Sequence, residues 1–299
     1  MSKSILIAGG TGFIGFHLAK KCLSMNWIVT SLSTNNPKKN RKLQKVNYKI
    51  CDVSNYSQIT KKIKSKYDYV VNLAGYVDHT HKSKTMKSHY IGCKNLSKYF
   101  LNSKIKKFVQ IGSCIEYGKI NSPQKESNFN NKTFSFYGRA KLLSTQFSQN
   151  LYKKFNFPVT ILRLYLVYGP YQDANRVIPV TIINSLKNRE FDCSNGLQLR
   201  DFTYIDDVIN AIIKTLKNSK SSGEIINIGS GRPISIKKVI IKICKLLKSG
   251  KPIFGKINLR KDEIMKLYPN ISKAKKILSW EPHIPLERGL KKTIKFFNK

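Results

Sequence analysis

Short apolar runs alternate with longer amphipathic stretches along the first half of the chain. The apolar runs that predict strands are Ser4–Ala8, Trp27–Leu32, Val46–Cys51, Tyr69–Leu73, Phe108–Ile111 and Pro158–Tyr165. The stretches between them that predict helices are Phe13–Met25, Ser57–Ser65, Lys84–Leu101 and Tyr137–Phe155. Strands separated by helices of this length predict βαβ units, right-handed crossovers and a buried parallel sheet.

The second half of the chain has a different pattern, because Gly and Pro residues divide it into shorter pieces. Glu224–Ile228 predicts a late strand, and Ser235 predicts the N-cap of an amphipathic helix. We therefore expect an α/β protein with a Rossmann-like, doubly wound parallel sheet and a smaller C-terminal substrate lobe. Residues 1–165 are predicted to form the dinucleotide-binding domain, joined by a later strand near 200–230, and residues 166–299 mainly the substrate-binding lobe.

The net charge is +39, from 55 Lys and Arg against 16 Asp and Glu. The Lys residues are spread along the whole chain, and Arg, which is better suited to phosphates and bases, is scarce. We therefore expect no nucleic acid as a partner, with RNA binding kept as an alternative. No apolar run approaches the ~20 residues of a membrane span, and the N-terminus enters a strand directly, so we expect neither a membrane partner nor a signal peptide.

The cysteines indicate a reducing compartment. No two of them have C-x-x-C spacing, and most lie in apolar runs. We expect buried, reduced thiols in a cytoplasmic protein and no metal site.

A glycine-rich turn follows the first predicted strand. Gly9, Gly12 and Gly15 have G-x-x-G-x-x-G spacing and lead into the first predicted helix, which begins with Phe13 and Ile14. Glycines let backbone N–H groups approach a pyrophosphate, and the N-terminus of a helix favours its negative charge. The position between a strand and a helix makes this turn a predicted dinucleotide site.

Two Tyr-x-x-x-Lys pairs occur in the chain, Tyr137 with Lys141 and Tyr90 with Lys94. With so many lysines the spacing alone decides nothing, but on a helix it places both side chains on one face. Ser113 follows the strand Phe108–Ile111 and lies upstream of Tyr137, whereas Tyr90 has no such partner. We therefore predict that Ser113, Tyr137 and Lys141 are catalytic.

These three residue types suit hydride transfer at a carbonyl group. A free tyrosine has a pKa of ~10, and we expect the Lys141 cation, with an oxidised nicotinamide when one is present, to lower the pKa of Tyr137 so that it exchanges a proton near neutrality. Ser113 can hydrogen-bond to the substrate oxygen and hold it for transfer.

A series of motifs resembles the extended short-chain dehydrogenase/reductases, the NAD(P)-dependent nucleotide-sugar epimerase, dehydratase and reductase family. The motifs stand in the family's order: GGTGFIG, CDV, NLAG, IGSCIEYG, YGRAK, LRLYLVYGP, RDFTYIDD, NIGSG and a closing segment SKAKKILSWEPHIPLERGLKKTIKFF. The resemblance runs nearly from end to end of the chain. It implies a nucleotide-diphosphate sugar as substrate and a homodimer through the helices near 84–102 and 137–155.

The resemblance also implies roles for individual residues. Catalysis falls to Ser113, Tyr137 and Lys141; cofactor binding to Gly9, Gly12, Phe13, Ile14, Gly15, Ser33, Asp52, Val53, Leu73, Ala74, Gly75, Tyr137 and Lys141; and substrate binding to Ser113, Arg200 and, more weakly, Arg176. A bidentate guanidinium at Arg200 suits the diphosphate, and the alternative for either arginine is an ordinary ion pair.

Three departures from the family pattern bear on the reaction. The 4,6-dehydratases carry an Asp-Glu pair where this chain has Cys114 and Ile115, so we expect no dehydratase activity. Leu166 replaces an Asn that many epimerases have, and His89 replaces a structural Asn.

Two further histidines, His79 and His81, lie near the expected sugar pocket. We expect both to belong to a solvent-facing loop.

The end of the second strand bears on the choice of cofactor. NAD sites usually place Asp or Glu there, whereas this chain has Ser33 and small polar residues, followed by Lys38, Lys39 and Arg41. We therefore favour NADP over NAD. Together these features favour an NAD(P)H-dependent reductase of a nucleotide-linked 4-keto-6-deoxyhexose. The alternatives are a nucleotide-sugar 4-epimerase with tightly bound NAD and a non-catalytic dinucleotide-sensing protein.

Overall fold

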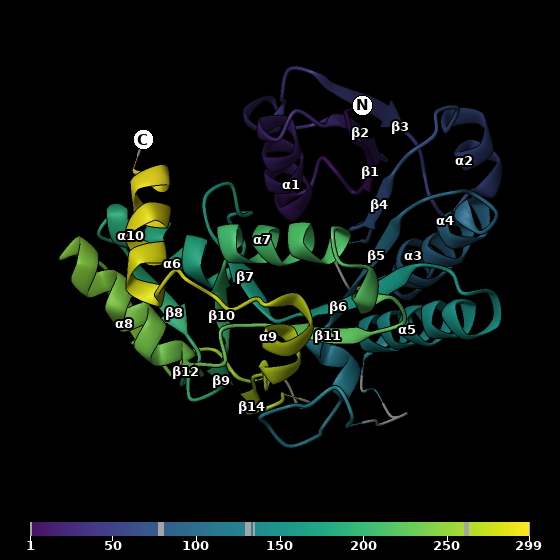
Figure 1. Ribbon diagram of the computed structural model, residues 1–299. Coiled ribbons are helices and arrows are strands. Elements are labelled where there is room, and N and C mark those ends of the chain that lie inside the picture. Colours follow the sequence, from purple (N-terminus) through teal and green to yellow (C-terminus); the bar gives the residue numbers. More distant parts are fainter. Residues whose placement is uncertain (1, 77–80, 129–132, 134, 260–262, 299) are drawn as a thin grey trace.

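A seven-stranded sheet forms the centre of the computed structural model, which describes residues 2–76, 81–128, 133, 135–259 and 263–298 (Figure 1). Every pair of neighbouring strands is parallel, and the strand order is β11-β6-β5-β4-β1-β2-β3. The strands are β1 (Ser4–Ala8), β2 (Ile28–Ser33), β3 (Val46–Ile50), β4 (Tyr69–Asn72), β5 (Lys107–Ser113), β6 (Val159–Leu164) and β11 (Ile225–Ile228). The fold is the predicted Rossmann-like α/β fold.

Helices cover both faces of this sheet. On one face lie α1 (Phe13–Ser24) and α7 (Ile205–Leu216), and on the other lie α2 (Tyr56–Lys62), α4 (Gly92–Phe100) and α5 (Phe136–Phe155). The strands supply alternate residues to two separate cores: Ile5 and Ile7 of β1 pack on the first side, Leu6 and Ala8 on the second. This period of two explains why the strands are apolar throughout, since both of their faces are buried.

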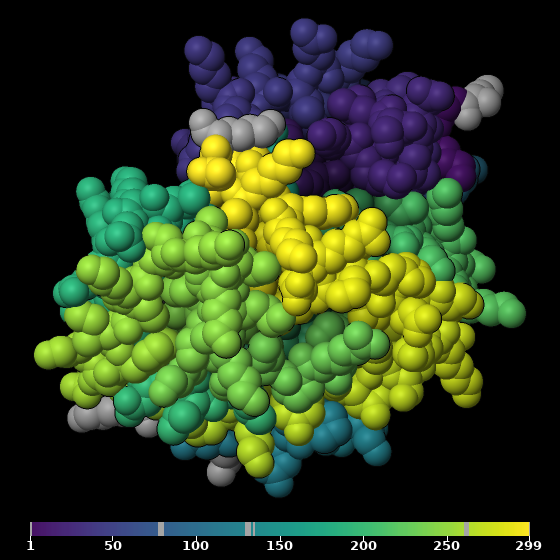
Figure 2. Space-filling model, turned by 90° about the vertical axis from the view of Figure 1, so that its left-hand side faces the viewer, coloured from purple at the N-terminus to yellow at the C-terminus, as the bar shows by residue number. Residues whose placement is uncertain are grey.

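The rest of the second half forms small sheets and helices beside the carboxyl ends of the central strands (Figure 1). The strands are β7 (Leu166–Tyr168), β8 (Glu190–Cys193), β9 (Leu199–Arg200), β10 (Phe202–Tyr204), β12 (Ile234–Ser235), β13 (Lys251–Phe254) and β14 (Lys266–Leu267). The helices are α6 (Val177–Leu186), α8 (Ile236–Leu247), α9 (Ser272–Leu278) and α10 (Leu286–Phe297). Figure 2 shows the N-terminal segments in purple and blue at the top of one face, and the segments from α8 onward over most of the rest.

Most predicted elements agree with the structure within a residue or two at each end. The main difference is Lys84–Leu101, which is not one regular helix: α3 (Lys82–Met86) continues into the π-helical segment η2 (Lys87–Ile91) and then α4. Ser235 caps α8 as predicted and accepts a hydrogen bond from the backbone N–H of Lys238 at 3.2 Å. The late strand β11 pairs with β6 at the edge of the central sheet, while the division of the chain at residue 165 stays a prediction.

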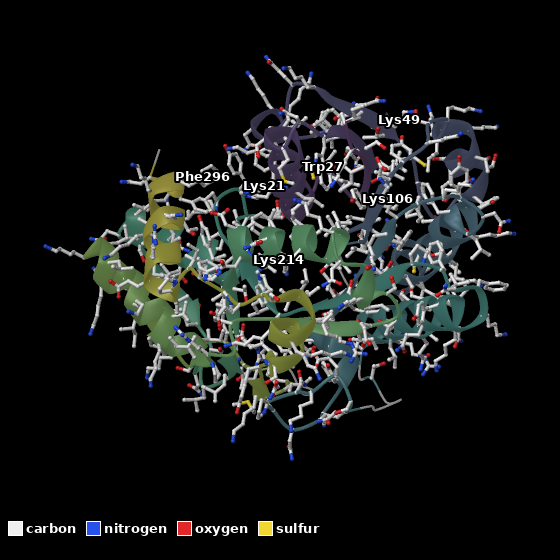
Figure 3. The ribbon with its side chains drawn as sticks, viewed as in Figure 1. Lys21, Trp27, Lys49, Lys106, Lys214 and Phe296 are labelled. Carbon is white, nitrogen blue, oxygen red and sulfur yellow. The ribbon has the colours of Figure 1, made fainter. Side chains whose placement is uncertain are left out.

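The lysines are not confined to one part of the fold. The labelled lysines of Figure 3, Lys21, Lys49, Lys106 and Lys214, come from α1, β3, the turn before β5 and α7. No helix in the described part of the chain is both long enough and apolar enough to cross a membrane.

Candidate active site

The glycine turn between β1 and α1 is closely packed where side chains would not fit. Gly9 has a φ of +80°, and a Cβ there would lie 2.7 Å from the carbonyl carbon of Leu73. A Cβ on Gly15 would lie 2.3 Å from the carbonyl oxygen of Gly9, so this glycine lets α1 approach the turn. Both positions therefore require glycine for the chain to follow this path.

The N-terminus of α1 is open for a ligand. Gly12 is its N-cap, and no side chain among the described residues caps the helix. The backbone N–H groups of Phe13 and Ile14 therefore point out of the helix end, where a Cβ on Gly12 would meet only the carbonyl oxygen of Gly9, at 3.3 Å. Such a cradle of free N–H groups fits the pyrophosphate of a dinucleotide.

The other predicted cofactor residues line the same edge of the sheet. Ser33 ends β2, and its hydroxyl accepts a hydrogen bond from the backbone N–H of Thr11 at 3.3 Å. The remaining ones follow the carboxyl ends of β3 and β4 and are Asp52, Val53, Leu73, Ala74 and Gly75. Two of the three cations that follow Ser33 form ion pairs: Lys38 and Arg41 both bind Asp173, at 3.3 and 2.8 Å.

The predicted catalytic residues come together at the carboxyl end of β5. Ser113 ends that strand, Tyr137 lies in the first turn of α5, and the Ser113 side chain is close enough to Tyr137 to act on its pKa. The buried Lys141 Nζ donates a hydrogen bond of 2.6 Å to the carbonyl oxygen of Ile111 and lies 6.0 Å from the centre of the Tyr137 ring. The other Tyr-x-x-x-Lys pair consists of Tyr90 on η2 and Lys94 on α4. Ser113 acts on Tyr137, which distinguishes the Tyr137 pair as the candidate site.

Burial dominates the electrostatics of this group. It raises the pKa of Tyr137 to about 12, although the hydrogen bond with Ser113 and the charge of Arg176 act to lower it. It also lowers the pKa of Lys141 to about 8. Burial therefore raises the pKa of Tyr137 where the sequence analysis expected a lower one, and the lowering by an oxidised nicotinamide stays a prediction.

A buried carboxylate next to the trio was not identified from the sequence. Glu116 lies in the 3₁₀ turn η3 (Cys114–Tyr117) and accepts hydrogen bonds from the backbone N–H of Ser113 at 2.7 Å, Thr145 Oγ1 at 2.7 Å and Arg163 Nε at 2.9 Å. The Ser-x-x-Glu spacing of Ser113 and Glu116 is that of a capping box, which is the signal that could have revealed it.

The two arginines predicted to bind substrate have different environments. Arg200 is buried and forms an ion pair with Glu263, while its Nη1 donates to the carbonyl oxygen of Leu199 at 2.9 Å. The charge of Arg200 acts to lower the pKa of Cys114, the residue directly after Ser113. Arg176 is exposed at the N-cap of α6, and its charge acts to lower the pKa of Tyr137.

Apolar packing surrounds the positions where dehydratases carry acids. Cys114 packs with Tyr165 and Leu267, and Ile115 lies against the same cluster. Burial raises the pKa of the Cys114 thiol to about 12, so it is neutral near neutral pH. Neither position supplies an acid.

The histidines and Leu166 that the sequence singled out lie in different environments. His89 is buried, with its ring edge-to-face on Tyr137 at a centroid distance of 5.1 Å, and Leu166 is half-buried in β7. His81 is exposed, and His79 lies outside the described residues.

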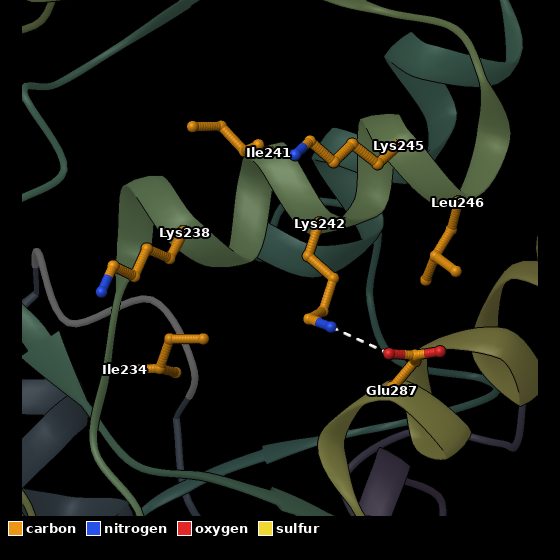
Figure 4. A pocket seen from close by; sticks show the side chains of 7 residues that line it. All are labelled: Ile234, Lys238, Ile241, Lys242, Lys245, Leu246 and Glu287. Carbon is orange, nitrogen blue, oxygen red and sulfur yellow. Dashed lines mark hydrogen bonds and ion pairs between the residues drawn. The ribbon is translucent and has the colours of Figure 1, made fainter.

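A separate surface pocket lies between α8 and α10 (Figure 4). It is lined by Ile234, Lys238, Ile241, Lys242, Lys245, Leu246 and Glu287. Lys242 and Glu287 form an ion pair of 2.9 Å across it. None of the predicted site residues lines this pocket, so it belongs to another part of the surface.

Comparisons with known proteins identify the family and the fold. The chain is 28% identical to human dTDP-D-glucose 4,6-dehydratase over 321 residues, covering 99% of this chain and 90% of the relative. It is 32% identical to UDP-glucuronate 4-epimerase of Thermodesulfobacterium geofontis over 209 residues, covering 69% of this chain and 64% of the relative. The structure of UDP-glucuronic acid 4-epimerase from Bacillus cereus, in complex with UDP-glucuronic acid and NAD, superimposes with a TM-score of 0.88 and 25% identity over 99% of both chains. The sequence profile described as the NAD dependent epimerase/dehydratase family matches residues 5–229, and the chain belongs to this family of enzymes that act on nucleotide sugars.

Proposed function

We propose that the protein reduces a nucleotide-linked 4-keto-6-deoxyhexose at C4, with NADPH as the reductant. The observation that carries this proposal is the geometry at the carboxyl end of β5, where Ser113, Tyr137 and Lys141 come together while the adjoining Cys114 and Ile115 pack in an apolar cluster. A phenol that keeps its proton near neutral pH is ready to act as an acid, which is what reduction of a carbonyl group requires. Cys114 and Ile115 provide no acid for water elimination, which argues against dehydration.

The residues of the trio would divide the work of the reduction. Reduced nicotinamide, when bound, supplies the hydride that adds to C4. The carbonyl oxygen then takes the electron pair of the C=O bond, Ser113 donates a hydrogen bond to it, and Tyr137 donates its phenolic proton. Lys141 stabilises the phenolate that remains until solvent returns a proton.

The cofactor and substrate would lie on opposite sides of this trio. The free N–H groups of Phe13 and Ile14 would hold the pyrophosphate of the dinucleotide. Arg200, and secondarily Arg176, would hold the diphosphate of the sugar nucleotide, because a guanidinium can donate two parallel hydrogen bonds to two phosphate oxygens. The absence of a carboxylate at Ser33 supports NADP, whereas the pairing of Lys38 and Arg41 with Asp173 supports NAD.

A nucleotide-sugar 4-epimerase is the second candidate. It is supported by several 4-epimerases among the similar proteins, one of which is in complex with NAD in its solved structure. Such an enzyme would use the same trio but return the hydride to the sugar it came from. It would therefore keep its NAD through purification and need no external reductant.

A single experiment distinguishes the two candidates. The purified protein is first assayed for bound nicotinamide, and is then supplied with NADPH or NADH and a panel of nucleotide-linked 4-keto-6-deoxyhexoses while absorbance at the nicotinamide band is followed. The proposal expects one reduced nicotinamide consumed per sugar. Interconversion of a hexose pair such as UDP-glucose and UDP-galactose with no change in absorbance would establish the epimerase instead.

The role of Tyr137 is tested in the same assay. Tyr137→Phe should abolish turnover and leave cofactor affinity nearly unchanged, because only the hydroxyl group is lost. Tyr90→Phe is the matched control and should have nearly wild-type activity. A Tyr137→Phe variant within about tenfold of wild type, or ~1.4 kcal/mol of barrier, would remove Tyr137 from the mechanism.

Three further properties belong to this proposal. We expect a homodimer through the helices near 84–102 and 137–155, which light scattering of the purified protein would measure. We expect no RNA binding, which filter binding across a salt series would test. The described cysteines, all free, support a cytoplasmic enzyme.

A further inference from the structure

Glu116 is bound to three different elements around the catalytic trio. One carboxylate oxygen accepts from the backbone N–H of Ser113, at the end of β5. The other accepts from Thr145 of α5 and from Arg163 of β6. A single side chain therefore connects the strand that carries Ser113, the helix that carries Tyr137 and Lys141, and the neighbouring strand.

The contact with α5 is on the catalytic face of that helix. Thr145 follows Lys141 by one helical turn, and Lys141 follows Tyr137 by one turn, so the three side chains share one face. A hydrogen bond of 2.7 Å to Thr145 thus fixes how far the catalytic face of α5 lies from the end of β5.

The ion pair of Glu116 with Arg163 is almost completely removed from solvent. Their side chains are 0% and 2% exposed, and the guanidinium also lies 4.3 Å from the centre of the Tyr117 ring. A buried ion pair is weak evidence for stability, because desolvating both charges costs as much as their attraction returns. The position of this ion pair beside the catalytic trio is therefore better explained by an effect on the trio than by a gain in stability.

We propose that Glu116, held by Arg163, is a positioning residue that fixes Ser113 relative to α5 and supplies a negative charge to the catalytic trio. This inference rests on the proposed use of Ser113, Tyr137 and Lys141 in hydride transfer, and it holds for either direction of that transfer.

The charge of Glu116 acts in the same direction on both titrating residues. Lys141 faces Glu116 from η3 and Cys93 from α4, and the charge of Glu116 opposes the lowering of the Lys141 pKa by burial. Tyr137 faces Glu116, Cys114 and Ser113 from β5 and η3, Arg176 from the N-cap of α6, and the ring of His89. The negative charge of Glu116 raises the pKa of both Tyr137 and Lys141, so its removal should lower both.

Glu116→Gln is the decisive variant, because it keeps the size of the side chain and removes the charge. We expect kcat to fall by more than tenfold, and the loss of kcat/KM at alkaline pH to begin about one pH unit lower, the scale of one nearby charge. Thr145→Val removes only the connection to α5 and should lower kcat without moving this alkaline limb. Glu126→Gln, which loses another glutamate that accepts a backbone N–H, is the matched control and should leave the alkaline limb in place.

A second measurement needs no substrate. NMR of lysine side chains labelled at Cε should contain a resonance that titrates near pH 8 and is absent from Lys141→Arg. In Glu116→Gln this resonance should titrate at lower pH. If the wild type shows no turnover that depends on Tyr137, the proposed function fails, while the Lys141 titration still tests the field of Glu116.

Two results would overturn the inference. One is a Glu116→Gln variant that loses activity with the alkaline limb and the Lys141 titration unchanged, which would make Glu116 a structural residue only. The other is a variant as active as wild type. If Glu116→Gln does not fold, the double variant with Arg163→Met leaves no unpaired buried charge, and it must still shift the Lys141 titration downward for the inference to stand.

Discussion

Removing the charge of Glu263, the ion-pair partner of Arg200, should lower the stability of the protein and raise its affinity for a nucleoside diphosphate. Arg200 is the predicted ligand of the substrate diphosphate, and its side chain is 10% exposed while that of Glu263 is 22% exposed. Burial lowers the pKa of Arg200, and the carboxylate of Glu263 opposes this, so the carboxylate compensates a partly desolvated cation. A diphosphate that binds Arg200 must compete with Glu263 for the same N–H donors.

The perturbation is Glu263→Gln, which keeps the shape and removes the charge. The free energy of unfolding without ligand should fall by about 1–2 kcal/mol, between the values for exposed and fully buried ion pairs. Affinity for a nucleoside diphosphate should rise about five- to tenfold, or ~1–1.4 kcal/mol, because the competing carboxylate is gone.

Two measurements on the same protein check these effects. Thermal unfolding without nucleotide should show a lower midpoint for the variant, and titration calorimetry with UDP and dTDP should show tighter binding. Glu281→Gln is the matched control, because its ion pair with Lys275 is 54% exposed on both sides, and it should change neither value. Unchanged or weaker nucleotide binding by Glu263→Gln would refute the assignment of Arg200 to the diphosphate.

Two other predictions concern the cofactor and the pH dependence of stability. Ser33→Asp should lower the ratio of kcat/KM for NADPH to that for NADH by about tenfold or more, because a carboxylate repels a 2′-phosphate and accepts from a 2′-hydroxyl; a wild type that already prefers NADH contradicts the cofactor proposal. Lys107 is buried and donates hydrogen bonds to Ser219, Ser221 and Ser222, and burial lowers its pKa to about 8. Because its unfolded pKa is ~10.4, the unfolded state holds the extra proton between these values, so this lysine makes stability rise by about 2 kcal/mol from pH ~7 to ~9.5. Urea unfolding of Lys107→Met should lack this rise relative to wild type, and parallel pH curves for the two proteins would contradict it.

Local patterns were sufficient to predict the sheet and its dinucleotide turn. A strand buried on both faces must be apolar throughout, so Ser4–Ala8 is readable as β1 with the bounds that the structure has. A Cβ on Gly15 would meet the backbone of Gly9 and Gly10, so its need for glycine follows from the adjoining sequence, whereas a Cβ on Gly9 would meet the distant Leu73 and Ala74. The irregular η2 between α3 and α4 was not predicted, because hydrophobic periodicity hardly distinguishes a π-helical turn from an α-helix.

The candidate trio was also accessible from the sequence. Tyr137 and Lys141 are one helical turn apart, and Ser113 follows a predicted strand of a parallel sheet, whose carboxyl ends share one edge. Short-range spacing and strand order together therefore indicated a common site without any coordinates.

Only the tertiary structure decided the charge state and the partners of these residues. The burial that raises the pKa of Tyr137 comes from packing by several elements, and no local pattern encodes it. Glu116 with Arg163, and Arg200 with Glu263, are pairs whose members lie on different elements far apart in the sequence. In a chain with 55 basic and 16 acidic residues, each carboxylate has many possible partners, and only the fold determines which cation it meets.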